Sequence, residues 1–183
     1  MLLHNLMQWI ADTDWSVGLH ESRYAYSIIE SVHVWTLCLF VGFAVFLDLR
    51  LLGVTLKRVP VSQITERILP WTKVAFVFMV LSGLLLFFAI PLRTYHNVFF
   101  RLKAVLLVLA AANAWVFHNG RMYRRLAEWD TAATTPRAAK IAGAFSLALW
   151  IGIIFSGRMI AYNWFDCDKP EPAFVDLVAG CVR

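Results

Sequence analysis

The sequence predicts an all-α fold, a polytopic membrane protein built as a bundle of four transmembrane helices. Composition gives the first reason: of the 183 residues, 60% are hydrophobic and 16% are charged. Soluble domains average about 45–50% apolar and about 25% charged residues. A chain this short cannot hide the surplus in one soluble core, so the apolar surface must face lipid.

The spacing of charged residues gives the second reason. Lys, Arg, Asp and Glu are absent from four stretches, which are residues 31–47, 74–92, 104–120 and 141–157. A helix that rises 1.5 Å per residue needs about 20 residues, within a range of about 17 to 25, to cross the hydrocarbon core. Each stretch has 17 or 19 residues. Lys and Arg at the ends extend the span by reaching to water, so all four stretches qualify.

Prolines and polar turns predict where the spans end. Pro60 and Pro70 are expected to bracket the first connection, Pro91 to close the second span, and residues 134–136 to precede the fourth. The predicted organisation is an N-terminal segment (1–24), a transmembrane domain (25–162) and a C-terminal tail (163–183).

The loops differ in charge between the two sides of the predicted bundle. The connections after the first and third spans carry ten cations and four acids, whereas the side of the termini carries seven cations and eight acids. Loops rich in Lys and Arg stay in the cytoplasm. We therefore predict a bacterial inner-membrane protein with both termini periplasmic. Because topology accounts for the basic charge, no nucleic-acid partner is expected.

Histidines are the main candidates for chemistry. His4 and His20 precede the first span and are interpreted as surface residues. His33 lies about one turn inside that span, where a histidine usually faces the bundle interior and has a partner. His96, in the connection between spans two and three, is expected on the same side and at a similar level. His118 ends the third span at the opposite face, so one cofactor can bridge His33 and His96 but not His33 and His118.

Two imidazoles at one depth in a four-helix bundle can hold a haem iron from both sides. We therefore predict haem b with His33 and His96 as the axial metal ligands. Arg93, Arg101 and Arg158 lie on the same face and are predicted to pair with the haem propionates. His118 is the candidate ligand of a second haem near the cytoplasmic face, so one or two haems are expected.

Charged residues near span ends have a simpler interpretation. Glu30 and Arg158 are placed to pair with each other, and Asp48 lies at the other end of the first span, level with lysines. Paired or snorkelling helix-end charges are the favoured reading. Glu30 and His33 also have the Glu-x-x-His spacing of di-iron bundles, but the second copy and the further glutamates that such a site needs are absent from the sequence.

The three cysteines divide between the span and the tail. Cys38 lies in the first span and is expected to be a buried, small apolar residue. Cys167 and Cys181 lie in the predicted periplasmic tail, where an oxidising compartment favours a disulfide between them.

Two resemblances extend this reading. The stretch from Glu30 to Gly53, with Ser146 to Gly152, Gly157-Arg158 and Ala161-Tyr162, resembles a family of small bacterial four-helix membrane proteins of unassigned function. That resemblance implies the same bundle and no activity.

A second, shorter resemblance concerns residues 100–107, 117–121 and 124–125, together with residues 30–35. These stretches are similar to the bacterial membrane protoporphyrinogen IX oxidase. The similarity implies haem b at the early histidine, which is His33. The end of the fourth span and the acidic tail depart from the oxidase pattern, so porphyrinogen oxidation is not implied with the haem.

The sequence thus predicts a membrane-embedded b-type cytochrome that passes electrons between the membrane and a periplasmic partner. Two alternatives stay open. One is a porphyrinogen- or quinone-linked membrane oxidase, and the other is a cofactor-free structural subunit of a larger membrane complex. The expected partners are the lipid bilayer and a redox protein in the membrane or periplasm, with assembly into a larger complex or a homo-oligomer left open.

Overall fold

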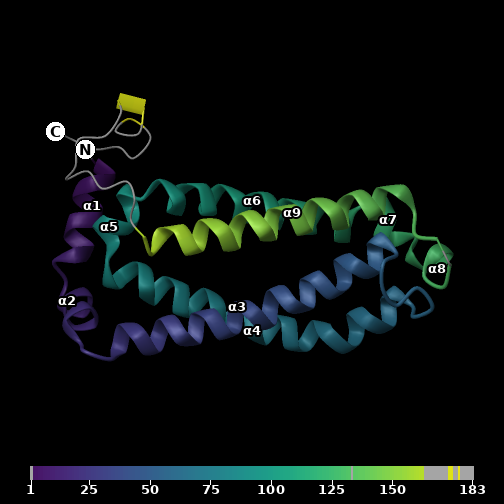
Figure 1. The fold of residues 1–183 in the computed structure, drawn as a ribbon, viewed down its shortest axis with the longest axis horizontal. Coiled ribbons are helices and arrows are strands. Elements are labelled where there is room, and N and C mark those ends of the chain that lie inside the picture. Colours follow the sequence, from purple (N-terminus) through teal and green to yellow (C-terminus); the bar gives the residue numbers. More distant parts are fainter. Residues whose placement is uncertain (1, 133, 163–172, 175–176, 178–183) are drawn as a thin grey trace. The chain divides into compact units, whose positions relative to one another are not determined.

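The computed structural model describes residues 2–132, 134–162, 173–174 and 177 (Figure 1). All regular secondary structure in these residues is helical, as the sequence predicts.

Among the described residues, four helices are long and apolar enough to cross a membrane, which confirms the four predicted spans. They are α3 (Ala25–Leu52), α4 (Val61–Ala89), α6 (Val98–Asn119) and α9 (Arg137–Ile160). Each of these helices is longer than the charge-free stretch that predicted it, because the helical backbone continues through the charged residues on either side. The chain is therefore a multi-pass membrane protein.

The five other helices in the described part of the chain are short. They are α1 (Leu2–Ala11), α2 (Asp14–Glu21), α5 (Pro91–His96), α7 (Arg121–Arg124) and α8 (Leu126–Trp129). Thr13 caps α2, because its side chain accepts a hydrogen bond from the backbone N–H of Ser16. The Ser16 hydroxyl in turn donates to the carbonyl oxygen of Phe88 at 2.7 Å, and α1 packs against α5 (Figure 1). The N-terminal segment is thus attached to the end of α4.

The two prolines of the first connection behave differently from each other. Pro60 directly precedes α4, as expected, but Pro70 lies inside this helix. The prediction that Pro70 ends the connection was therefore wrong. A proline removes one helical hydrogen bond, and transmembrane helices tolerate this loss because neighbouring groups satisfy the freed carbonyl. Pro91 follows the end of α4, as predicted, and it is the first residue of the short helix α5.

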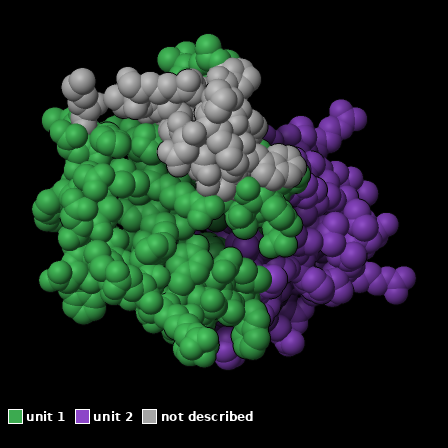
Figure 2. All heavy atoms as spheres, turned by 60° about the vertical axis from the view of Figure 1, so that its left-hand side comes forward, with its two compact units in different colours: residues 1–35, 78–104, 154–183 green, residues 36–77, 105–153 purple. Residues whose placement is uncertain are grey.

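The chain forms two compact units (Figure 2). Unit 1 contains the described parts of residues 1–35, 78–104 and 154–183, and unit 2 contains residues 36–77 and 105–153. Each unit includes a segment of every long helix. Leu2 and Tyr162 both belong to unit 1.

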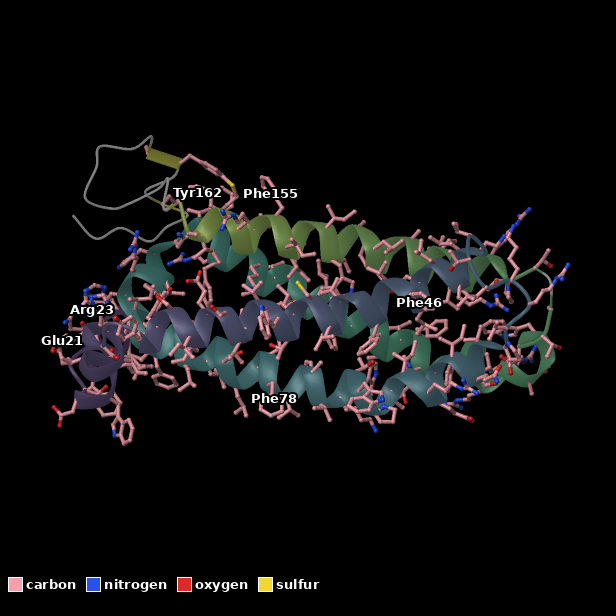
Figure 3. All side chains as sticks on the ribbon, turned by 60° about the horizontal axis from the view of Figure 1, so that its bottom comes forward. Glu21, Arg23, Phe46, Phe78, Phe155 and Tyr162 are labelled. Carbon is pink, nitrogen blue, oxygen red and sulfur yellow. The ribbon has the colours of Figure 1, made fainter. Side chains whose placement is uncertain are left out.

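Apolar side chains cover the outside of both units. Phe78 and Phe155 in unit 1 are 53% and 58% exposed, and Phe46 in unit 2 is 46% exposed (Figure 3). Inside unit 2, one buried cluster contains Val41, Trp150 and Ile153. Exposed aromatic side chains on membrane-length helices are the surface that a bilayer covers.

Candidate functional site

His33 occupies the interior face of α3 in unit 1, where it contacts α4. Its Nδ1 atom lies 3.0 Å from the carbonyl oxygen of Met79 and 3.1 Å from the Ser82 hydroxyl oxygen. A carbonyl can only accept, so Nδ1 carries the hydrogen. The Ser82 hydroxyl donates to the carbonyl oxygen of Phe78 at 2.6 Å, which leaves its oxygen able to accept from His33 as well. In the neutral imidazole, Nε2 then carries the lone pair. The predicted interior position with a partner is confirmed.

A glycine on α4 makes this close approach possible. A Cβ atom added to Gly83 would lie 3.1 Å from Cε1 of His33 and 3.5 Å from Nδ1. The first distance is tighter than ordinary van der Waals contact, so a side chain here would push the imidazole away from its carbonyl acceptor. Gly83 therefore helps to fix the position of the ring.

Lys103 is a second ionisable residue inside a span of unit 1, and its place inside the helix was not predicted from the sequence. It acts electrostatically on His33, and its Nζ atom lies 3.6 Å from the position of a Cβ added to Gly157 of α9. The predicted third span began after Lys103, whereas α6 begins at Val98. Lysines inside membrane spans are uncommon and usually serve a function.

A helix-capping signal would have revealed this position. Asn97 directly precedes α6, and its side-chain oxygen accepts hydrogen bonds from the backbone N–H groups of Phe99 and Phe100, at 3.0 and 3.3 Å. Asparagine is among the preferred N-cap residues. A helix start read from Asn97 places Lys103 more than one turn inside the helix.

Ser156 adds an unusual polar group to the same unit. Its side chain on α9 is fully buried, and its hydroxyl oxygen has no hydrogen-bond partner. Buried hydroxyls are normally paired, so each exception needs an explanation. Ser156 directly precedes Gly157, the residue beside Lys103.

His96 has a neighbour that the sequence did not predict. Its ring centroid lies 5.5 Å from that of His4 on α1 and 5.0 Å from that of Tyr95. His4 was expected to be a surface residue, but it is half-buried, and its Nδ1 atom is buried without a hydrogen-bond partner. Packing of α1 against α5 brings these two imidazoles together. The pairing of His33 with His96 on one iron stays a prediction.

Two of the three arginines predicted to hold propionates contact tyrosines. Arg101 donates from Nε to the carbonyl oxygen of Tyr95 at 3.0 Å, and its guanidinium lies 4.8 Å from the centroid of that ring. Arg158 donates to the hydroxyl of Tyr162, labelled in Figure 3, at 3.2 Å. Arg93 is exposed. These contacts hold the guanidinium groups at the surface of unit 1.

His118 ends α6 in unit 2. Its Nδ1 atom lies 2.9 Å from the carbonyl oxygen of Ala114, and its ring packs against Tyr123 with centroids 5.0 Å apart. Within the described part of the chain, no group of three or more His, Cys, Asp or Glu side chains is arranged to hold a metal ion.

The cysteine predictions have different outcomes. Cys38 is a free thiol and is exposed, so the prediction that it is buried was wrong. The residue lies on an exposed face of α3 together with Trp35 and Leu39. Cys167 and Cys181, predicted to form a disulfide, lie outside the described residues.

Four membrane-length helices in the described residues define a multi-pass membrane protein, and two of these helices contain the half-buried ionisable residues His33 and Lys103. The chain belongs to a family of unknown function, DUF6644, whose sequence profile matches residues 16–163. This match supports the resemblance to a family of unassigned function. It includes His33, His96 and Lys103, and it begins after His4. Neither a curated protein nor a solved structure matches the chain.

Proposed function

We propose that the chain is a membrane-embedded b-type cytochrome in which Nε2 of His33 ligates the haem iron. One observation carries the proposal, the hydrogen bond between Nδ1 of His33 and the carbonyl oxygen of Met79. Metal-ligating histidines almost always donate their other ring N–H to a carbonyl, carboxylate or water, which fixes the tautomer and raises the basicity of the ligating nitrogen. His33 has this arrangement on the interior face of a membrane-spanning helix.

The charged residues of unit 1 suit the anionic propionates. Lys103 is the cation that acts on His33 and is therefore the first candidate for a propionate contact. Arg93, Arg101 and Arg158 remain proposed partners on the same side. Arg158 is exposed, and a contact between an exposed cation and an aromatic ring contributes only about 0.5 to 1 kcal/mol, so this guanidinium can exchange its ring contact for a charge-assisted hydrogen bond.

The second axial position is proposed for His96, with His4 as its competitor. Both imidazoles belong to unit 1, and their rings are neighbours. A bound haem would supply reversible one-electron transfer. The protein would hold the iron through His33, orient the imidazole through α4, and exclude water with its apolar helices. The proposed electron partner is a periplasmic or membrane redox protein, with the basic loops of unit 2 on the cytoplasmic side.

The proposal is tested by the haem-to-protein ratio and the absorption spectrum of protein made with ample haem. His33→Ala should lose the haem or convert it to the high-spin form. His96→Ala and His4→Ala identify the second ligand. Only the variant that lacks this ligand should change from a low-spin to a high-spin spectrum. His20→Ala is the matched control, since His20 is an exposed imidazole of unit 1. A purified protein without a Soret band would refute the proposal and favour the cofactor-free subunit.

A further inference from the structure

Asp48 of α3 is buried in unit 2, inside a membrane-length helix. Its exposed fraction is 6%, and its Oδ2 atom is buried without a hydrogen-bond partner. The side chain of Ser146 on α9 hydrogen-bonds the carboxyl group. Gly143 allows α9 to approach closely, because an added Cβ would lie 3.1 Å from the Asp48 carbonyl oxygen. The expectation that Asp48 reaches water or pairs with a lysine is therefore not met.

Arg50, a buried cation two residues after Asp48 on α3, is bound to other groups. Arg50 is 1% exposed, and its Nε donates to the carbonyl oxygen of Val59 at 2.8 Å. Its two terminal nitrogens donate to the Thr135 hydroxyl at 3.3 Å and to the Asp130 carbonyl oxygen at 3.5 Å. Residues two apart on a helix point in different directions, at about 100° per residue. The Arg50 guanidinium is thus held by neutral oxygens of the connecting segments.

An ionised carboxylate in this position would be costly. A charge removed from water requires a counter-charge or several hydrogen-bond donors, and without them the group takes up a proton instead. Ser146 provides one neutral hydroxyl, and the other carboxyl oxygen has no donor. Burying a neutral carboxylic acid costs far less free energy than burying a carboxylate, because the acid leaves only uncharged polar atoms without partners.

We propose that Asp48 is an intramembrane proton-binding site, a carboxylic acid that carries its proton at neutral pH. The inference does not depend on the proposed haem. Asp130 in the same unit provides the contrast. Its two carboxyl oxygens accept hydrogen bonds from the backbone N–H and the hydroxyl of Ser62, so both oxygens have donors.

Infrared spectroscopy of the full-length protein in membranes at neutral pH tests this assignment. The difference spectrum between wild type and Asp48→Asn should contain the C=O stretch of a protonated carboxylic acid, with the small downshift in heavy water that an exchangeable acid proton causes. The matched variant Asp130→Asn should instead remove carboxylate bands. If Asp48→Asn instead loses a carboxylate band, the wild-type side chain is ionised and the proposal is overturned, whether or not a cation is bound to that carboxylate.

A second measurement uses wild-type protein, in case Asp48→Asn fails to assemble. An apolar carbodiimide reacts with a protonated carboxyl in apolar surroundings: the oxygen bonds to the carbodiimide carbon, the acid proton moves to nitrogen, and acyl migration gives a stable N-acylurea with no leaving group. Peptide mass mapping should find the adduct on Asp48 at several-fold higher yield than on Asp130. Equal or lower yield on Asp48 would overturn the proposal.

Discussion

At the scale of single residues, the polar atoms inside unit 1 determine how His33 is held. The Met79 carbonyl fixes the tautomer, Ser82 provides a second acceptor, and Gly83 leaves room for the ring. None of these three contacts requires a charged partner. The imidazole is therefore positioned by α4 before any ligand binds, which is the preorganisation that a ligating side chain needs.

Gly83→Ala tests this positioning. The new methyl group would meet Cε1 of His33 at 3.1 Å, and overpacking of this kind typically costs about 1 to 3 kcal/mol. We expect a lower thermal unfolding temperature in detergent and a shifted or weakened haem spectrum.

Gly42→Ala is the control, because a Cβ at Gly42 meets nothing within 4 Å. Alanine is the better helix former by up to about 1 kcal/mol, so this variant should be unchanged or slightly more stable. Equal behaviour of the two variants would show that Gly83 has no special role.

Lys103→Met tests the electrostatic contribution of Lys103. A positive charge near the haem favours the reduced form, which carries one positive charge fewer, so its removal should lower the midpoint potential. Redox titration measures the change. Lys57→Met, which removes an exposed lysine in unit 2, should leave the potential unaltered. An unchanged midpoint potential in Lys103→Met would show that the Lys103 ammonium group does not lie close to the haem.

At the scale of secondary-structure elements, the connection between α3 and α4 is held by a buried arginine. Arg50 donates to Val59 within the connection and to Thr135, just before α9. The connection is short because α4 begins at Val61 and continues through Pro70. The Arg50 side chain thus connects α3 with the α3–α4 connection and with the segment just before α9.

Arg50→Ala should loosen this end of unit 2. Hydrogen bonds to charged groups contribute about 1.5 to 3 kcal/mol each, so losing those to Val59 and Thr135 should destabilise the protein by several kcal/mol. Limited proteolysis should then cleave the segment between α3 and α4 faster. Arg58→Ala, which removes an exposed arginine from the same segment, should be cleaved at the wild-type rate. Similar cleavage of both variants would argue against the role of Arg50.

At the scale of the whole molecule, composition and charge spacing were sufficient to predict the four spans, because a bilayer imposes one length on every spanning helix. They were not sufficient for the site. Lys103 was missed because the span was assumed to begin at its last charge, and the role of His4 depends on packing of α1 against α5. Such tertiary contacts leave no periodic signal in the sequence. The burial of Asp48 was missed for the same reason, since it results from the close approach of Gly143.

Topology is the molecular property that the loop charges predict. The segments between the charge-free stretches 31–47 and 74–92, and between 104–120 and 141–157, carry ten cations and four acids, so this side should be cytoplasmic and the chain end after Arg183 periplasmic. Paired reporters fused after Arg183 measure this, one active only in the periplasm and one only in the cytoplasm. Activity of the cytoplasmic reporter would invert the assignment of both faces.

Ligation of the haem iron by Nε2 of His33 is the central claim, and the reduced-minus-oxidised spectrum of His33→Gly with and without added imidazole tests it most directly. Removing the side chain should abolish the low-spin b-type band, because the iron loses one axial nitrogen. Free imidazole should enter the vacated space and restore the band, which a purely structural role of His33 would not allow. A low-spin band that persists in His33→Gly without imidazole, or a wild-type protein that has no haem, would contradict the claim.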